Sequence, residues 1–335
     1  MRDLYFGIIV FFLFTSCTNQ KPMEYLFYQG PIQGTMFNIT YEWNKDLAHE
    51  IDSLLQNFNK SLSNYDSTST VSMLNQNKTN KTDELFDKMW EISYEVFEET
   101  NGAFDITIAP IVNEWGFGWI KRNAGEIPDS ALILSKLQYV GMNKINLKNS
   151  SLTKLYKESM IITNAVAQGL SVDYIADYFL ELGLKNFLIE IGGEIYCHGA
   201  NNRGEKWRIG IDKPIEGSGY DNRENQIILS LSGKAVATSG NYRKYIEDGG
   251  TKIGHSIDPR TGFPAQNSLL SVTVVSESCA LSDAYATAFM VSGFVKSYQI
   301  ACDLKSIEAY FIYVDENGIE RFDQTPGFSK LLIEE

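Results

Sequence analysis

The sequence predicts an α+β fold built from mixed or antiparallel sheets with packed helices, not a Rossmann fold. Residues 35–43 alternate between apolar and polar side chains, which is typical of a strand with one buried face. Residues 46–59, 83–99 and 166–182 instead repeat apolar side chains at helical spacing. The predicted strands and helices do not alternate regularly, and the sequence has no GxGxxG or Walker motif. These observations favour α+β over a parallel, doubly wound sheet.

Further elements are predicted in order along the chain. Helices are expected near 130–140 and over 280–291, and the nearly continuous apolar run 187–191 predicts a buried strand. Shorter strands are expected at 144–148, 152–156, 160–163, 207–212, 227–231, 270–275 and 308–314. Residues 315–318 predict the turn of a final hairpin. Residues 61–70 and 101–118 are expected to form loops.

The composition excludes some classes of partner. The chain has 335 residues, of which 44% are hydrophobic, so a globular protein is expected. It carries 29 Lys and Arg against 42 Asp and Glu, a formal net charge of −13. So acidic a chain, with no basic cluster, disfavours nucleic acid as a partner.

The first residues predict an export signal. Residues 1–16 contain one early arginine, an apolar run too short to span a bilayer, and small residues at the end, which together predict a signal peptide. Cys17 follows directly and is the predicted lipidation site; ordinary secretion with cleavage nearby is the alternative. Residues 17–30 are then expected to form the lipidated cysteine and a tether. Residues 31–335 are expected to fold as one region or as two closely packed subdomains.

Cysteines and histidines show no metal or redox motif. If Cys17 carries lipid, three cysteines remain, which cannot all pair. We expect these three to be small buried residues: Cys197, Cys279 and Cys302. The three histidines are too scattered along the chain to suggest a zinc site.

An aromatic loop is the first candidate for ligand binding. Residues 102–110 and 115–118 combine Gly, Pro and aromatic residues, with Phe104 as a flat surface and Asp105 as a lone acid among them. Such a loop could hold an aromatic ligand; packing of its rings on the core is the alternative.

Two turn-rich segments are weaker candidates when taken alone. Residues 163–169 place small residues at the start of a helix. They could expose backbone groups to a ligand; tight packing at the helix start is the alternative. Residues 254–262 gather His, Asp and Arg between turn signals, which fits either a functional turn or a hairpin with polar decoration.

A pair of oxygen-bearing side chains is the fourth candidate. Asp283 and Thr287 stand at positions i and i+4, so on a helix they project from one face. Two hard oxygen ligands among small residues suit Mg²⁺, which takes the rest of its shell from water or phosphates. The alternative is that Asp283 is an acid favoured by the dipole near a helix N-terminus.

In this order, the segments resemble the ApbE family, the FAD:protein FMN transferases, over residues 34–320. The resemblance is carried by Gly34-Thr35, Ser63-Asn64-Tyr65, 72–75, 102–110, 191–194, 201–207, 237–242, 255–262 and 283–287. It implies an ApbE-like (T-fold-like) architecture and Mg²⁺-dependent cleavage of FAD. FMN would pass to a Thr or Ser of an acceptor protein, and AMP would be released. It also implies a bacterial membrane lipoprotein that faces the periplasm, expected in the inner membrane, and an acceptor that is a flavin-carrying subunit of a membrane redox complex.

The resemblance also implies roles for individual residues. Contacts to FAD would come from Gln33, Tyr65, Ala103, Phe104, Asp105, Gln168 and Ile257. Metal ligands would be the Ala165 carbonyl, Asp283, Thr287 and the Ala286 carbonyl. His255 is the candidate base, since imidazole titrates near neutral pH, and Asp283 is the second residue expected to be essential for catalysis.

The sequence departs from the common family form within residues 162–168. The family has Asp where Ile162 stands, Gly-Gly where Asn164-Ala165 stand, and Lys or Glu where Gln168 stands, which leaves the nucleotide contacts open. Two alternatives therefore remain: a periplasmic FAD pyrophosphatase that yields FMN and AMP, and a lipoprotein that binds FAD without turnover.

Overall fold

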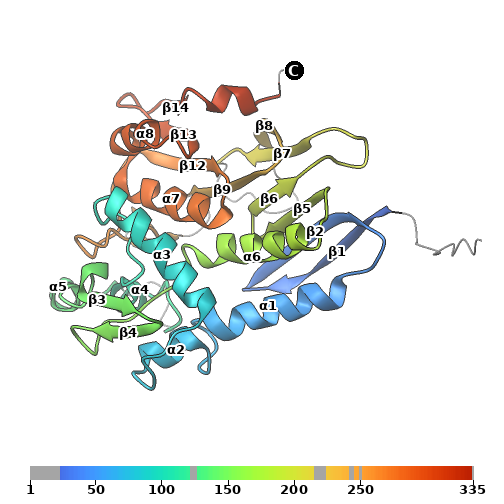
Figure 1. The fold of residues 1–335 in the computed structure, drawn as a ribbon. Helices are drawn as coiled ribbons and strands as arrows, with labels where there is room; N and C mark the ends of the chain where they lie inside the picture. The colour runs from blue at the N-terminus through green and yellow to red at the C-terminus, as the bar shows by residue number, and fades with distance from the viewer. Residues whose placement is uncertain (1–22, 121–126, 215–223, 241–244, 249–250, 334–335) are drawn as a thin grey trace, which may run out of the picture.

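An eight-stranded antiparallel sheet runs through the centre of the molecule (Figure 1). The computed structural model describes residues 23–120, 127–214, 224–240, 245–248 and 251–333. The strand order is β1-β2-β5-β6-β9-β12-β13-β14. The bounds are β1 Glu24–Ile32, β2 Thr35–Trp43, β5 Phe187–Ile191, β6 Glu194–His198, β9 Lys234–Gly240, β12 Leu269–Ser276, β13 Glu308–Val314 and β14 Glu320–Gln324.

Three small hairpins and a set of helices surround this sheet. The hairpins are β3 Ile145–Lys148 with β4 Ser151–Lys154, β7 Trp207–Asp212 with β8 Asn225–Leu231, and β10 Tyr245–Asp248 with β11 Thr251–Gly254. The α-helices are α1 Ala48–Leu62, α2 Thr70–Asn75, α3 Glu84–Glu99, α4 Ala109–Glu114, α5 Ser130–Leu137, α6 Ala167–Glu181, α7 Cys279–Ser292 and α8 Phe294–Asp303. Short 3-10 helices span Met142–Lys144 and Phe328–Leu331.

The two faces of the central sheet are covered differently. Helices α1, α3, α6 and α7 lie together on one face (Figure 1) and form the main apolar cores with β2, β5, β12 and β13. Hairpin β7–β8 forms a separate apolar core with the opposite side of β9, β12 and β13. Nearly every residue of β12 is buried because both of its faces are covered.

The predicted fold class is confirmed: the structure is α+β, with antiparallel pairing throughout the central sheet. The strands predicted at 35–43 and 187–191 have the predicted bounds, and the helices predicted at 83–99 and 166–182 match α3 and α6 within a residue. The final hairpin turn is also confirmed. No helix of the described part is long and apolar enough to cross a membrane.

The tether prediction was wrong for residues 24–30. These residues form most of β1, which pairs along its whole length with β2. The two-residue turn between the strands is Gln33-Gly34, and both residues have positive φ (50° and 75°), as a tight hairpin of this kind requires. Residues 1–22, which hold the predicted signal peptide and Cys17, lie outside the described residues.

Two further predictions need correction. Residues 160–163 do not form a strand; Met160 makes only an isolated bridge with Ile108. Cys302 is exposed, whereas Cys197 and Cys279 are buried as predicted, and none of the three forms a disulfide within the described part of the chain.

Candidate functional site

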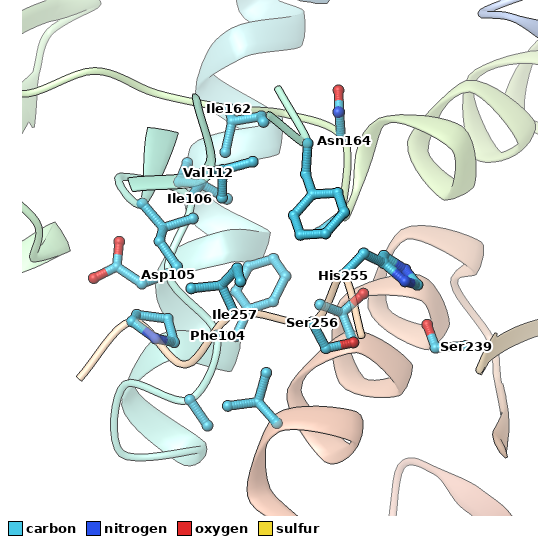
Figure 2. A pocket seen from close by; sticks show the side chains of 17 residues that line it. Phe104, Asp105, Ile106, Val112, Ile162, Asn164, Ser239, His255, Ser256 and Ile257 are labelled. Atoms are coloured by element: carbon cyan, nitrogen blue, oxygen red, sulfur yellow. The ribbon is translucent and has the colours of Figure 1, made fainter. Parts of the chain in front are cut away.

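A pocket of about 180 Å³ lies where four chain segments meet (Figure 2). Its walls come from residues 103–117, from 162–165, from 255–259 and from α7, with Ser239 at the end of β9 as a further contact. We call it the apolar pocket because most of its lining is apolar: Ala103, Phe104, Ile106, Ile108, Val112, Phe117, Ile162, Ile257, Pro259 and Val291. It therefore brings together predicted site residues that lie up to 184 positions apart in the chain, from Ala103 to Thr287.

Polar groups are concentrated on one side of the apolar pocket. Figure 2 shows His255, Ser256 and Ser239 on this side, and Asn164 above them. The His255 ring meets the Phe117 ring edge-on, with 6.3 Å between centroids. A base placed here faces the pocket beside hydroxyl groups and opposite apolar walls.

The aromatic loop is held rigidly by its own side chains. Phe104 is only 1% exposed, and its N–H donates to the Thr100 hydroxyl, which itself bonds the end of α3. The loop therefore combines both roles that the sequence suggested, because Phe104 lines the pocket and also packs in the hydrophobic core. It presents a fixed ring to the pocket while packing its other side on α3 and α7.

Asp105 has a structural role in this loop. Its carboxylate accepts hydrogen bonds from the Thr107 N–H (2.7 Å) and hydroxyl (2.5 Å) and from the Met142 N–H (3.2 Å). Burial raises the pKa of Asp105 to about 6, against the lowering effect of these bonds. In Figure 2 the carboxylate points away from His255. The contact of Asp105 with FAD stays a prediction. In the structure its carboxylate binds Thr107 and Met142 and stabilises the loop.

The turn at 254–262 divides its polar residues between two tasks. Asp258 and Arg260 bond each other, with Arg260 Nε 2.8 Å from Asp258 Oδ1, and the Gly262 N–H donates to the Asp258 carbonyl. This pairing closes the turn. His255 and Ile257 are the members that line the pocket.

The predicted metal residues meet at the start of α6 and the middle of α7. The Gly169 N–H, which in a regular helix would donate to the Ala165 carbonyl, donates instead to Asp283 Oδ2 at 3.1 Å. Among the described residues no N–H donates to the Ala165 carbonyl. Ala165 and Thr287 both line the apolar pocket, and Asp283 lies one helical turn before Thr287.

These groups fit a divalent cation that prefers oxygen ligands. Asp283 is 7% exposed, and burial raises the pKa of its carboxyl. Gly169 supplies a single neutral donor, so the carboxylate keeps acceptor capacity for a cation. The described residues contain no group of three or more His, Cys, Asp or Glu suited to a metal. A site here would therefore use one carboxylate with a carbonyl and a hydroxyl, which suits Mg²⁺ better than zinc.

Ala286 is placed less favourably than the other predicted ligands. It is fully buried and is not part of the pocket lining. Its carbonyl lies within α7, where the helical pattern directs it towards the N–H of residue 290. Its role as a ligand stays a prediction.

A second, larger pocket of about 750 Å³ is lined by the residues still unplaced among the predicted FAD contacts. We call it the polar pocket; Gln33, Tyr65 and Gln168 line it. Both amide atoms of Gln33 are buried and have no hydrogen-bond partner among the described residues, as expected of a side chain that a ligand would complete. Asn164 lines both pockets, so the two cavities adjoin at the residue before Ala165.

Sequence reasoning missed the residues that hold segment 161–165 in place. Asn64 donates to the Ile161 carbonyl and accepts from the Thr163 N–H (both 2.9 Å). Asn75 bonds both the N–H and the carbonyl of Ile161, at 2.7 and 2.8 Å. Side-chain amides thus replace a neighbouring strand, which explains why 160–163 is not part of a sheet. The available signal was two asparagines in the segments 63–65 and 72–75 that carried the family resemblance.

Ile162, the residue at which the family resemblance led us to expect an acid, lies in an apolar environment. It is 5% exposed and belongs to an apolar cluster with Ile108, Ile111 and Ile257. The inner wall of the apolar pocket therefore offers no carboxylate at this point, and a ring bound there would meet apolar side chains.

Comparison with known proteins gives a consistent result. The profile of the ApbE family matches residues 33–311. The FAD:protein FMN transferase of Vibrio cholerae is 33% identical over 331 residues, which cover 96% of this chain and 97% of the relative. The enzyme of the same name from Haemophilus influenzae is 30% identical and 95% of each chain is covered.

Solved structures agree with this relationship. The flavin transferase ApbE from Vibrio cholerae superimposes with a TM-score of 0.83 at 32% identity, covering 93% of this chain and all of the other. The apo form of the flavinyl transferase ApbE from Pseudomonas stutzeri gives 0.81 at 28% identity, covering 92% and 97% of the two chains.

Proposed function

The chain belongs to the ApbE family, and on that premise we propose that it is a Mg²⁺-dependent flavin transferase. It would cleave FAD, attach FMN through a phosphoester bond to a Thr or Ser of an acceptor protein, and release AMP. Relatives that match nearly the whole chain carry the name FAD:protein FMN transferase. The observation in this chain that carries the proposal is the adjoining pair of pockets, which share Asn164, with the predicted ligand Ala165 next to it on the wall of the apolar pocket.

The arrangement suits a dinucleotide with two ring systems. One ring would enter the apolar pocket against Phe104 and Ile257, and the other would occupy the polar pocket beside Tyr65, which is 68% exposed. The pyrophosphate that links them would then pass Asn164 and Ala165, where the predicted metal ligands lie.

The residues of this chain divide the chemical work. Asp283, Thr287 and the Ala165 carbonyl would hold Mg²⁺, which when bound supplies charge neutralisation for the pyrophosphate. His255 would take the proton of the acceptor hydroxyl at one of its ring nitrogens. The fixed walls of the apolar pocket orient the substrate and exclude water, which favours transfer to a protein hydroxyl over hydrolysis.

The metal residues give the sharpest test of this proposal. Asp283→Ala removes the one charged ligand, so AMP release should fall by about 100-fold or more, equivalent to about 2.7 kcal/mol. Thr287→Val keeps the shape and loses one neutral oxygen, so its loss should be smaller and partly reversed by high Mg²⁺. Asp177→Ala, an exposed acid of α6, serves as the control and should behave as wild type.

The assay follows AMP and the mass of a candidate acceptor after incubation with FAD and Mg²⁺. AMP release with an acceptor mass increase of one FMN supports transfer. AMP release without that increase identifies a pyrophosphatase, and FAD binding without AMP identifies a binding protein. Normal AMP release by Asp283→Ala at low millimolar Mg²⁺ would show that the metal site is elsewhere.

The position in the cell is a further part of the proposal. Residues 13–17, Leu-Phe-Thr-Ser-Cys, support lipidation of Cys17 and anchoring of the catalytic region to the bacterial inner membrane, facing the periplasm. A flavin-carrying subunit of a membrane redox complex would then be within reach as acceptor. Cys17→Ala should release the protein from membranes or block its processing. An unacylated N-terminus in the wild-type protein would contradict this part alone.

A further inference from the structure

Two hydrogen-bonded contacts join helices α6 and α7, and they lie one turn apart on each helix. At the first point the Gly169 N–H donates to Asp283, as described above. At the second point Asp173 of α6 meets the first residues of α7. Gly169 and Asp173 are four residues apart on α6, so they lie on the same face, and the two contacts fix α7 along its axis.

Asp173 makes three hydrogen bonds at the start of α7. Its Oδ1 accepts from the Cys279 N–H at 2.7 Å. Its Oδ2 accepts from the Ala280 N–H at 3.0 Å and from the Ser278 hydroxyl at 2.7 Å. The carboxylate is 7% exposed and lines neither the apolar nor the polar pocket, so it does not reach the substrate directly.

These bonds complete the hydrogen bonding of the α7 N-terminus. The Leu281 N–H donates to the Ser278 hydroxyl, and the Ser282 N–H donates to the Ser278 carbonyl. Only the N–H groups of Cys279 and Ala280 then remain, and Asp173 accepts both. Because the first turn of α7 contains no acid, the negative charge at this helix end comes from the neighbouring helix.

The same end of α7 is also tied to the central sheet. The buried Cys279 thiol donates to the Ile195 carbonyl of β6, at a sulfur–oxygen distance of 3.5 Å. Cys279, the first residue of α7, is therefore hydrogen-bonded both to Asp173 of α6 and to Ile195 of the central sheet. Any shift of α7 that breaks the Asp173 contacts moves Asp283 and Thr287, which lie one and two turns further along.

We propose that Asp173 is a positioning residue for the metal site: by fixing α7 against α6, it holds Asp283 and Thr287 opposite the Ala165 carbonyl. The inference rests on the proposed Mg²⁺-dependent function and assigns a task to a residue outside both pockets. Loss of the Asp173 hydrogen bonds would allow α7 to shift or rotate relative to α6. The distances from Asp283 and Thr287 to the Ala165 carbonyl would then increase, although all three groups remain.

A matched pair of variants tests this role. Asp173→Asn replaces one acceptor oxygen by an NH₂ group that opposes the N–H groups of α7. Asp83→Asn makes the same change at the N-cap of α3, where Asp83 also accepts three hydrogen bonds, from Ser61, Thr70 and Phe86. Asp83 lines neither pocket. Both variants should melt at lower temperature than wild type.

Metal affinity separates the two variants. Binding of Mn²⁺ to the protein saturated with FAD is followed by the electron paramagnetic resonance of the free ion. Asp173→Asn should raise the Kd by about tenfold or more, as loss of a supporting residue does at other metal sites. High Mg²⁺ should restore its AMP release. Asp83→Asn should leave the Kd of wild type unchanged.

The outcomes are distinguishable. A lower melting temperature with an unchanged Kd in Asp173→Asn would overturn the positioning role and leave the proposed function intact. Absence of Mn²⁺ binding in wild type would overturn the metal site itself and the proposed function with it. If Asp173→Asn does not fold, Ser278→Ala removes one of the three donors to Asp173; a Kd unchanged in that variant would equally overturn the proposal.

Discussion

Gly169 is the position where a single methyl group should disturb the proposed metal site most directly. It is the third residue of α6, and a Cβ added there would lie 2.4 Å from the Cys279 carbonyl oxygen and 2.9 Å from Ala280 Cα. Both neighbours are backbone atoms of α7, so no side chain can rotate away. Ordinary contact would require the two helices to separate by roughly 1 Å at this point.

The magnitude follows from two opposing effects. Ala is favoured over Gly within a helix by about 1 kcal/mol. Overpacking against backbone costs about 1–3 kcal/mol, and the separation also lengthens the 3.1 Å hydrogen bond from Gly169 to Asp283 beyond a useful distance. We therefore expect Gly169→Ala to lower the free energy of unfolding by about 1–2 kcal/mol and to raise the Mg²⁺ concentration needed for half-maximal AMP release.

Gly318→Ala provides the control for this measurement. Gly318 lies in the β13–β14 turn with φ +76° and no atom within 4 Å of an added Cβ. Its variant should also lose about 1 kcal/mol, because alanine is strained in this conformation, but its Mg²⁺ dependence should equal that of wild type. Urea unfolding and AMP release against Mg²⁺ are measured for both. A Gly169→Ala protein that is more stable than wild type, with unchanged Mg²⁺ dependence, would refute the reasoning.

Three further predictions concern other parts of the molecule. The pKa of Asp105 is about 6 in the folded protein, above its unfolded value, so the free energy of unfolding should fall by about 2 kcal/mol as the pH rises from 4 to 6. Asp105→Asn should remove this pH dependence in urea unfolding. Maleimide should label the exposed Cys302 in the folded protein and spare the buried Cys197, whose pKa is raised to about 12, as peptide mapping will show. Asn75→Ala leaves the Ile161 N–H without its partner, whereas the Ile161 carbonyl keeps the bond from Asn64, so the variant should lose about 1–3 kcal/mol of stability and show a raised KM for FAD.

Local patterns were sufficient for the elements whose burial is regular. Strand β2 alternates between apolar and polar residues because only one of its faces is buried. Strand β5, a short apolar run, packs in the same hydrophobic core. Strand β1 was missed because it lies at the sheet edge and none of its residues is fully buried. Its pairing depends on the Gln33-Gly34 turn, and a Gln-Gly pair is a weaker hairpin signal than Asn-Gly.

The candidate site was predictable as a set of segments but not as a geometry. Phe104, His255 and Thr287 all reach the apolar pocket, as their segments suggested. The same reasoning could not show that hydrogen bonds from Thr107 and Met142 would occupy the Asp105 carboxylate. The Met142 N–H is 37 residues away in sequence, so no local pattern indicates this bond. It also could not tell that Asn64 would support segment 161–165, because a contact across 99 positions leaves no local periodicity.

The metal residues show where sequence reasoning reached its limit and which signal it left unused. The spacing of Asp283 and Thr287 indicated one helical face, but a dipole role for Asp283 was equally open. The structure argues against that role, because α7 begins at Cys279, which leaves Asp283 beyond the first turn, and because Asp173 already satisfies the exposed N–H groups there. A buried carboxylate with one neutral donor is costly unless a cation shares it, so the surroundings of Asp283 favour a ligand role more strongly than its spacing does. Gly169 and Asp173 of α6 are also four residues apart and therefore lie on one face of that helix. This spacing was the sequence signal for the face of α6 against which α7 packs.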